Sequence, residues 1–277
     1  MRNIVLSPSR QDKIQSCPRK FYFNHVLNKS MIEKPSYFVE GDFIHFILEN
    51  YYKMKMRNEL NLGLLIELAR QQALKLSLTI EKSEELIKLF QEYQLFHQNE
   101  SWQVLGVEEA FAKVLYEDEK LDLRIIVQGK IDLRVQQQGI IILVDHKKIS
   151  QNRTPVERNN QILTYCFATD ARDFIINQIG TQKSLKPKDK FQRPYFNISD
   201  HQIEEWIEST IYSAFEIVRC YERNYFPARI TGCNYQGHKC EFYNVCQSKQ
   251  EDWQYQLEGS FQNHEDHDLM ASVSEEE

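Results

Sequence analysis

The sequence predicts an α/β protein in which a central mixed β-sheet is flanked by helices. Residues 41–96 carry apolar side chains at helical spacing, residues 104–147 are rich in β-branched residues divided by short polar turns, and helical and strand-like segments alternate from residue 155 to residue 223. These two periodicities distinguish helices from strands. A chain of 277 residues suffices for one large domain with small attachments.

The N-terminal half is predicted to be mainly helical. Ser7 can cap a helix whose first turn contains Pro8, with Ile14 and Cys17 following at helical spacing. A second short helix is expected at residues 19–26. Longer helices are predicted at residues 41–56 and, as one or two helices, at 62–96, so that a helical insert occupies about residues 50–100.

The second half supplies the sheet. Three consecutive strands are predicted at residues 104–115, 121–135 and 140–147, with turns at 117–119 and 136–139. The remaining elements are predicted to be a helix at 155–169, a strand at 173–179, a basic loop at 182–193, a strand at 194–198, a helix at 200–223 and a Cys-rich segment at 226–246. No clean boundary for a second full domain is visible, so residues 1–250 are predicted to form a single domain.

Charge is distributed unevenly along the chain. The net charge is −6, but residues 251–277 hold nine acidic residues and no Lys or Arg, and without them 34 basic residues face 31 acidic ones. Residues 1–30 contain six basic residues and one acidic residue. A basic surface is therefore available to nucleic acid. The acidic tail, 251–277, is predicted to be disordered, either as a solubilising segment or as a mimic of nucleic acid.

Nothing in the sequence indicates a membrane or an export route. The longest apolar runs are too short to span a bilayer, and no apolar signal-peptide segment precedes Pro8. We therefore expect a soluble, cytoplasmic protein whose six cysteines are not paired in disulfides. Cys166 and Cys220 fall within helical patterns and are expected to be packed thiols.

Two aspartates and a lysine lie on neighbouring predicted strands. Because side chains alternate along a strand, Asp145 and Lys147 should share one face while His146 points to the other. Asp132 lies on the preceding strand, and Gly129 beside it allows a close approach of ligand or backbone. Two carboxylates can hold Mg²⁺ or Mn²⁺, and a lysine can orient water or offset developing charge. A surface Asp–Lys pair is the commoner meaning of this spacing alone.

Other polar residues accompany this hairpin. His45 lies on the helix before the sheet, where a core histidine is the plainer interpretation. Gln161 and Tyr165 are four residues apart on the following helix and share a face, so both could reach a phosphate or a metal-bound water, or simply pack. Glu108 is a weaker candidate.

This succession resembles the PD-(D/E)xK nuclease superfamily, and most closely the RecB-type nuclease domains and the CRISPR-associated adaptation exonucleases. The resemblance covers residues 6–246, including the opening Leu6-Ser7-Pro8-Ser9-Arg10 and the segment Ser16-Cys17-Pro18-Arg19-Lys20-Phe21-Tyr22. It implies a restriction-endonuclease-like core. The residue roles that it implies are metal binding by His45, Asp132, Asp145 and the carbonyl of His146, catalysis by Lys147, and positioning of DNA or the lysine by Gln161 and Tyr165. Lys148 departs from the family, where a small or hydroxyl residue is common.

Four cysteines form a second candidate site. Cys233, Cys240 and Cys246 lie close together in sequence, and Cys17 lies far upstream. Thiolates suit Zn²⁺ and iron–sulfur clusters equally, and the residues alone leave both open beside unligated thiols. The resemblance implies a [4Fe-4S] cluster held by one upstream and three downstream cysteines, although six residues separate Cys233 from Cys240 where the family often has two.

The resemblance also implies the substrate, namely DNA with single-stranded or free ends, cut by an exonuclease. Arg19 and Lys20 could contact phosphates and Tyr22 could stack on unpaired bases. The chain has no phosphate-loop motif of a helicase motor, so unwinding would need a helicase partner. Recombination, repair, phage DNA metabolism and CRISPR spacer processing all fit such an enzyme. The alternative is a catalytically silent DNA-binding or scaffold module with the same fold.

Overall fold

In the computed structural model, which describes residues 2–32, 35–149, 159–235 and 238–263, the chain divides into two compact units. The central unit comprises residues 34–110 and 130–199, and the terminal unit comprises residues 1–33, 111–129 and 200–277. Both units are assembled from separate stretches of chain. Because the chain passes between the two units several times, no single linker of flexible composition separates them. This explains why the sequence shows no domain boundary.

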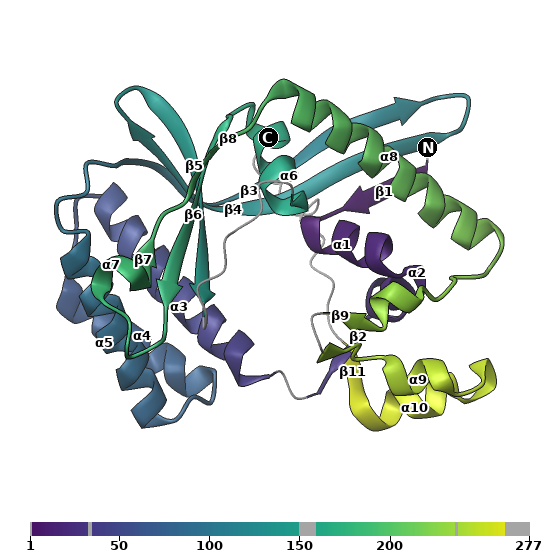
Figure 1. Ribbon diagram of the computed structural model, residues 1–277, viewed down its shortest axis with the longest axis horizontal. Coiled ribbons are helices and arrows are strands. Elements are labelled where there is room, and N and C mark those ends of the chain that lie inside the picture. The colour runs from purple at the N-terminus through teal and green to yellow at the C-terminus, as the bar shows by residue number, and fades with distance from the viewer. Residues whose placement is uncertain (1, 33–34, 150–158, 236–237, 264–277) are drawn as a thin grey trace. The chain divides into compact units, whose positions relative to one another are not determined.

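The central unit contains a mixed sheet, as expected (Figure 1). Strand β4 pairs antiparallel with β5, β5 pairs parallel with β6, and β6 pairs antiparallel with β7 and β8. The long strand β3 pairs with β4, and both strands continue into the terminal unit. The strand bounds are β3 Gln103–Asp118, β4 Leu123–Gln137, β5 Ile140–Ile149, β6 Asp173–Gly180, β7 Phe191–Gln192 and β8 Tyr195–Asn197.

The helices of the central unit are α3 Ser36–Met56, α4 Leu62–Lys75, α5 Ile80–Phe96, α6 Asn160–Thr169 and α7 Pro187–Lys190. Three of them, α3, α4 and α5, bury one large apolar cluster together with the sheet. Asn61 and Thr79 cap α4 and α5 by accepting backbone N–H groups at Leu64 and Lys82. Helix α3 buries Phe43, Ile44, Ile47, Leu48, Tyr51 and Tyr52, and it packs against β5. The helix that carries His45 is thereby fixed next to the strand that carries Asp145.

The terminal unit begins with a strand that sequence patterning did not reveal. Strand β1 (Arg2–Leu6) pairs parallel with the first half of β4, from Leu123 to Val127. The helices of this part are α1 Pro8–Ser16, α2 Pro18–Phe21, the π-helical turn η1 Tyr22–Val26 and α8 Asp200–Glu222. Ser7 caps α1 and accepts the Arg10 N–H, as predicted. Helix α8 packs on α1, where the buried Gln11 accepts a hydrogen bond from Trp206 at 3.1 Å.

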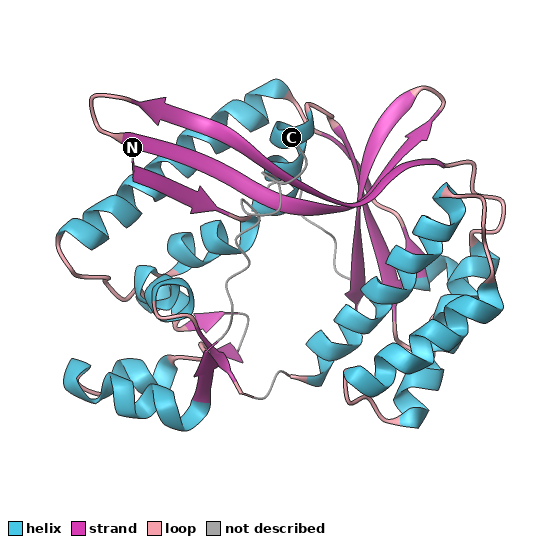
Figure 2. Cartoon of the chain, turned by 180° about the vertical axis from the view of Figure 1, so that it is seen from behind, coloured by secondary structure: helices cyan, strands magenta, loops and turns pink. Residues whose placement is uncertain are grey.

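The C-terminal part of this unit is built from short elements, which Figure 2 shows by type. They are η2 Ile230–Gly232, β9 Asn234–Tyr235, β10 His238–Lys239, α9 Tyr243–Gln247, η3 Gln250–Asp252, α10 Trp253–Ser260 and β11 Phe261–Asn263. Strand β11 pairs antiparallel with β2 (Lys29–Met31). A small apolar cluster joins them, made of Phe23, Phe242, Val245, Leu257 and Phe261.

Two sequence expectations differ from the structure, and a third lies partly outside the described residues. Residues 250–263 form η3, α10 and β11 instead of the start of a disordered tail, because Leu257 and Phe261 are buried; residues 264–277 lie outside the described residues. The expected loop at 182–193 contains α7 and β7. Helix α6 is described from Asn160, and the predicted residues 155–158 before it lie outside the described ranges. Among the described residues, no helix is long and apolar enough to cross a membrane.

Candidate functional site

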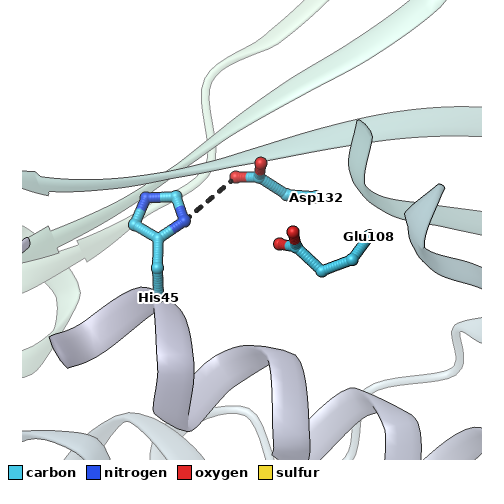
Figure 3. A group of neighbouring side chains, drawn as sticks. All are labelled: His45, Glu108 and Asp132. Carbon is cyan, nitrogen blue, oxygen red and sulfur yellow. Dashed lines mark ion pairs between the residues drawn. The ribbon is translucent and has the colours of Figure 1, made fainter. Parts of the chain in front are cut away.

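Three side chains of the central unit converge in a group with the character of a metal site (Figure 3). His45 on α3, Glu108 on β3 and Asp132 on β4 each offer one ligand atom, and these three atoms lie within 4.8 Å of one another. Nδ1 of His45 is 3.4 Å from a carboxylate oxygen of Asp132. In the part of the chain that the structure describes, no other trio of His, Cys, Asp or Glu side chains meets this condition.

Glu108 enters the group through an unusual backbone conformation. Its φ is +56°, in the left-handed region of backbone conformation that residues other than glycine and asparagine rarely adopt. Gly106, two residues earlier, could not carry a side chain without displacing Glu109, whose carboxylate would lie 2.0 Å from an added Cβ. The Glu108 carboxylate also pairs with Lys130 at 2.8 Å. The sequence offers Glu108 as a weaker candidate, but no sequence signal marks the backbone conformation that brings it to His45 and Asp132.

Asp145, Lys147 and Gln161 form a second polar group in the same unit. Lys147 Nζ donates to Oδ1 of Asp145 at 2.9 Å and to Oε1 of Gln161 at 3.0 Å. Gln161 Nε2 in turn donates to the same Asp145 oxygen at 2.7 Å and lies 3.2 Å from the Tyr165 hydroxyl. Asp145 and Lys147 therefore share a face, and Gln161 and Tyr165 share another, as the strand and helix periods predicted.

Burial sets the charge states of these groups. It raises the pKa of Asp132 well above its usual range, and the nearby Asp145 carboxylate adds to this effect. Burial lowers the pKa of Lys147, but its charge pairing and hydrogen bond with Asp145 outweigh burial and leave that pKa raised. Burial also lowers the pKa of His45, against the opposing charge of Asp145. The site thus combines a neutral imidazole, crowded carboxylates and an ammonium group.

The backbone of His146 connects the two groups. Its N–H donates to Oδ2 of Asp132 at 2.9 Å, and the same oxygen lies 3.4 Å from Nδ1 of His45. The His146 side chain is 3% exposed and points away from Asp145 and Lys147, as predicted. The sequence-predicted set is therefore assembled in one unit, with Glu108 added to it and with Asp145 bonded to Lys147 and Gln161 instead of joining the His45 trio.

Comparison with known proteins decides the family. A model of the PD-(D/E)XK nuclease superfamily matches residues 5–247 of the chain. The chain belongs to the PD-(D/E)XK nuclease superfamily. The mixed sheet flanked by helices agrees with the restriction-endonuclease-like fold of this superfamily, and membership implies a metal-dependent phosphodiesterase that acts on nucleic acid.

The other comparisons add little to this assignment. No curated protein matches the chain. A solved structure described as "Crystal structure of SSO0001" is similar at 12% sequence identity and a TM-score of 0.33, over 63% of this chain and 73% of that one. A likeness at this level supports no argument about fold or activity.

In this PD-(D/E)XK chain, the four candidate cysteines lie in the terminal unit and are not disulfide-bonded. Burial raises the pKa of Cys246 to about 11, with Arg19 opposing the rise and the nearby Cys240, Cys17 and Cys233 contributing to it. Sγ of Cys17 accepts the Arg229 N–H at 3.3 Å. Among the described residues no three of the sulfurs lie within 4.8 Å of one another, whereas a tetrahedral zinc site with Zn–S bonds of about 2.3 Å requires sulfurs roughly 3.8 Å apart.

The predicted DNA contacts have partners inside the terminal unit. The Arg19 guanidinium lies 5.0 Å from the Trp253 ring and donates to the Phe226 carbonyl at 3.2 Å. Lys20 pairs with Glu241 at 3.0 Å. Tyr22 packs against Phe226 and Trp253. Cys166 and Cys220 are buried, as expected for packed thiols.

Proposed function

We propose that the protein is a Mg²⁺- or Mn²⁺-dependent deoxyribonuclease that hydrolyses phosphodiester bonds. The observation that carries this proposal is the trio His45, Glu108 and Asp132 beside the hydrogen-bonded pair of Asp145 and Lys147. Oxygen-rich ligand sets of this kind suit hard divalent cations, and the imidazole of His45 suits Mn²⁺ as well. A basic side chain next to such a set suits a reaction in which negative charge develops on phosphate.

The residues divide into binding and positioning roles in this proposal. His45, Glu108 and Asp132 would hold the ion, with Asp145 and the carbonyl of His146 as further ligands. When bound, the ion would polarise the phosphate and lower the pKa of a water molecule. The Lys147 ammonium group offsets charge on the phosphate oxygens, and Gln161 orients Lys147 through the 3.0 Å hydrogen bond. Tyr165 restricts Gln161 from the same helix face.

End-labelled single- and double-stranded DNA incubated with Mn²⁺ or Mg²⁺ tests the proposal. We expect wild-type protein to cleave DNA only with metal, and Lys147→Ala to lose at least about a hundredfold in rate, as for removal of one electrostatic donor. Lys183→Ala is the matched control, because this lysine has a side chain 83% exposed and lies outside the site. Absence of cleavage by wild type, with DNA binding intact, would instead favour the catalytically silent module.

Metal binding provides a readout that does not depend on cleavage. Titration calorimetry with Mn²⁺ should show one strong site in wild type. Glu108→Gln and Asp132→Asn should each weaken it, because each removes a charged oxygen ligand. Unchanged affinity in Glu108→Gln would remove this residue from the site and leave the ligand set to Asp132 and Asp145.

We further propose that the enzyme is an exonuclease on single-stranded DNA ends, of the RecB-type or CRISPR-associated branch. The support is the motif order in the sequence and the lack of a helicase phosphate loop, which leaves unwinding to a partner. Recombination, repair, phage DNA metabolism and CRISPR spacer processing all supply such ends. Linear single strands should be degraded while circular ones of the same sequence persist; cutting of the circles would show an endonuclease. Products from 5′- and 3′-labelled strands would give the polarity.

For Cys17, Cys233, Cys240 and Cys246 we propose a structural [4Fe-4S] cluster. Support comes from the motif order in the sequence, from the proximity of Cys17, Cys233 and Cys240 to Cys246, and from the Arg229 N–H on Cys17 Sγ. Anaerobically purified protein should contain about four iron atoms and show an electron paramagnetic resonance signal after reduction. Stoichiometric zinc without iron would refute the cluster. Arg19, Lys20 and Tyr22 stay predicted DNA contacts beside it.

A further inference from the structure

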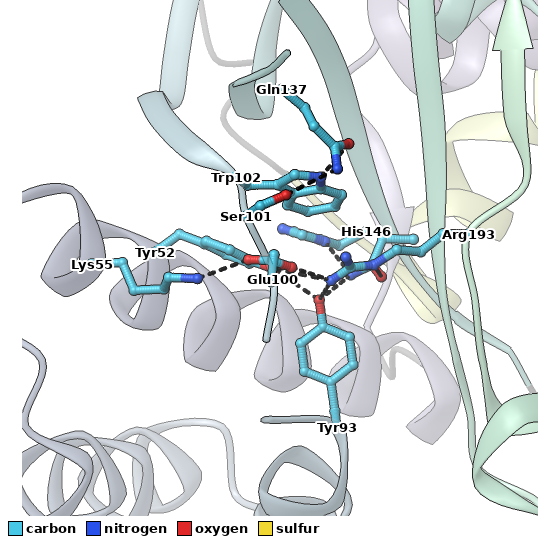
Figure 4. Close-up of polar contacts among 10 residues, drawn as sticks. Tyr52, Lys55, Tyr93, Glu100, Ser101, Trp102, Gln137, His146 and Arg193 are labelled. Atoms are coloured by element: carbon cyan, nitrogen blue, oxygen red, sulfur yellow. Dashed lines mark hydrogen bonds and ion pairs between the residues drawn. The ribbon is translucent and has the colours of Figure 1, made fainter. Parts of the chain in front are cut away.

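A buried polar network lies behind the strand that carries Asp145 and Lys147 (Figure 4). Arg193 is at its centre, and we call it the Arg193 network; its members are Tyr52, Tyr93, Glu100, His146, Asn177 and Arg193, all in the central unit. The Arg193 guanidinium donates to Glu100 at 2.5 Å and to the Tyr93 hydroxyl at 2.7 Å, and it lies 3.8 Å from the centre of the Trp102 ring.

The network ends on the ring of His146. Arg193 Nε donates to Oδ1 of Asn177 at 3.1 Å, and Nδ2 of Asn177 donates to Nδ1 of His146 at 2.8 Å. The His146 ring is stacked on Tyr52 with an angle of 9° between the ring planes. Both the in-plane direction and the tilt of this imidazole are therefore fixed, one by Asn177 and the other by Tyr52.

The backbone of His146 carries this constraint to the candidate metal ligands. Its N–H donates to Oδ2 of Asp132 at 2.9 Å, and that same oxygen lies 3.4 Å from Nδ1 of His45. A displacement of His146 would therefore shift Asp132 and, with it, the contact between Asp132 and His45. The path from Arg193 to the trio runs through two side-chain hydrogen bonds and one peptide backbone.

The physical reason for such a device is the repulsion among crowded ligands. Carboxylates within 4.8 Å of one another repel before a cation arrives, and a site that must bind quickly has to be held open in the binding geometry. A buried ion pair such as Arg193–Glu100 is a poor means of gaining stability, because apolar residues of similar size often stabilise as well. Its directional hydrogen bonds do fix one arrangement of strand β5.

We propose that Arg193 and Asn177 are positioning residues that hold His146, and through its backbone hold Asp132 and His45 in the arrangement that binds metal. This inference rests on the proposed metal site. It predicts that disturbing the ring of His146 weakens metal binding although the ring itself is not a ligand and the carbonyl of residue 146 remains. Partners that orient metal ligands from outside typically change metal affinity by tenfold or more.

Mn²⁺ titration of the full chain tests the inference, with thermal unfolding measured in parallel. His146→Phe keeps a ring stacked on Tyr52 and removes the nitrogen that accepts from Asn177. Arg193→Lys keeps a positive charge to pair with Glu100 and removes the guanidinium N–H that reaches Asn177. Both should raise the Mn²⁺ dissociation constant roughly tenfold. Tyr52→Phe is the matched control, because it keeps the ring under His146 and the Arg193–Asn177–His146 hydrogen bonds. It loses the hydroxyl bonds to Tyr93 and Glu100 and the long 3.4 Å bond from Arg193, and its Mn²⁺ affinity should stay within about twofold of wild type.

The outcomes separate the inference from the proposed function. Strong Mn²⁺ binding by wild type with unchanged affinity in His146→Phe and Arg193→Lys would overturn the positioning role and leave the nuclease proposal standing. The same holds if Tyr52→Phe weakens Mn²⁺ binding as much as the other two for an equal fall in melting temperature, since the network would then act through stability alone. Failure of wild type to bind Mn²⁺ would overturn the metal site and the inference with it.

Discussion

The buried pair of Glu100 and Arg193 allows a quantitative test of the central unit. Replacing Arg193 by Met removes the ion pair with Glu100, three further hydrogen bonds and the stacking on Trp102. Breaking a buried pair from one side typically costs about 3–5 kcal/mol. Glu100 would still be paired with Lys55 at 2.8 Å, so we expect a loss near the lower end, about 3 kcal/mol.

Replacing Glu100 by Met should cost more. Arg193 would stay buried with neutral partners only, and Lys55 would lose its acceptor, so we expect about 4 kcal/mol. The double variant Glu100→Met, Arg193→Met removes both charges and fills the space with apolar groups. Its loss should fall below about 2 kcal/mol, less than either single variant, which corresponds to a coupling of several kcal/mol.

Urea unfolding followed by circular dichroism and by tryptophan fluorescence measures these values, and Trp102 beside Arg193 serves as a local reporter. The reasoning would be refuted by additive losses, in which the double variant is destabilised by the sum of the two single variants. It would also be refuted if either single variant lost less than about 1 kcal/mol, the range of exposed pairs.

Three further predictions concern other parts of the molecule. Glu108→Gly should raise the free energy of unfolding by about 1 kcal/mol, because glycine adopts a φ of +56° without strain. It should also weaken Mn²⁺ binding. Urea unfolding measures the first effect and calorimetry the second, and a destabilised variant would show that the backbone at Glu108 is not strained. Burial, with the charges of Arg193 and Lys55, lowers the pKa of His97 to about 3. In the unfolded chain this pKa is about 6.5. Between these two pH values the unfolded chain therefore binds more protons than the folded protein, and the free energy of unfolding falls as the pH falls. The slope of the free energy of unfolding against pH should stay below the one-proton limit of about 1.4 kcal/mol per pH unit, because the side chain is half-buried. Urea unfolding across this pH window should give a flatter slope for His97→Phe than for wild type. An equal slope in the two proteins would contradict the lowered pKa of His97. Leu257→Ala should cost about 2–4 kcal/mol and speed amide exchange in residues 250–263, because Leu257 is 2% exposed; unaltered exchange would mean that α10 is not held by this side chain.

Strand and helix periods predicted much of the central unit. The alternation along β5 placed Asp145 and Lys147 on one face and His146 on the other, and the four-residue spacing joined Gln161 to Tyr165. Both inferences concern residues close in sequence, whose relative directions follow from a single element. Strand β1 escaped prediction because its five residues gain their structure from parallel pairing with β4, more than a hundred residues away.

The Arg193 network was missed, and Glu108 was only a weaker candidate, for related reasons. Arg193 closes a run of lysines that has the composition of a solvated loop. Its buried partners, Tyr93 on α5 and Glu100 after the end of that helix, are far away in the sequence. The participation of Glu108 depends on a backbone conformation that its residue type does not favour. Periodicity describes regular structure, so it cannot point to a site residue that departs from it.

The backbone of Glu108 also bears on how such a protein changes over generations. Selection for a well-folded chain alone would favour glycine or asparagine at this position, because these residues adopt the left-handed conformation at less cost. Under the proposed function, folding and metal binding therefore pull in opposite directions at this position, and we expect loss of the glutamate to bring a gain in stability. A descendant released from the need to cut DNA should lose this glutamate early and keep its fold, so the residue at position 108 can serve to separate active relatives from silent ones.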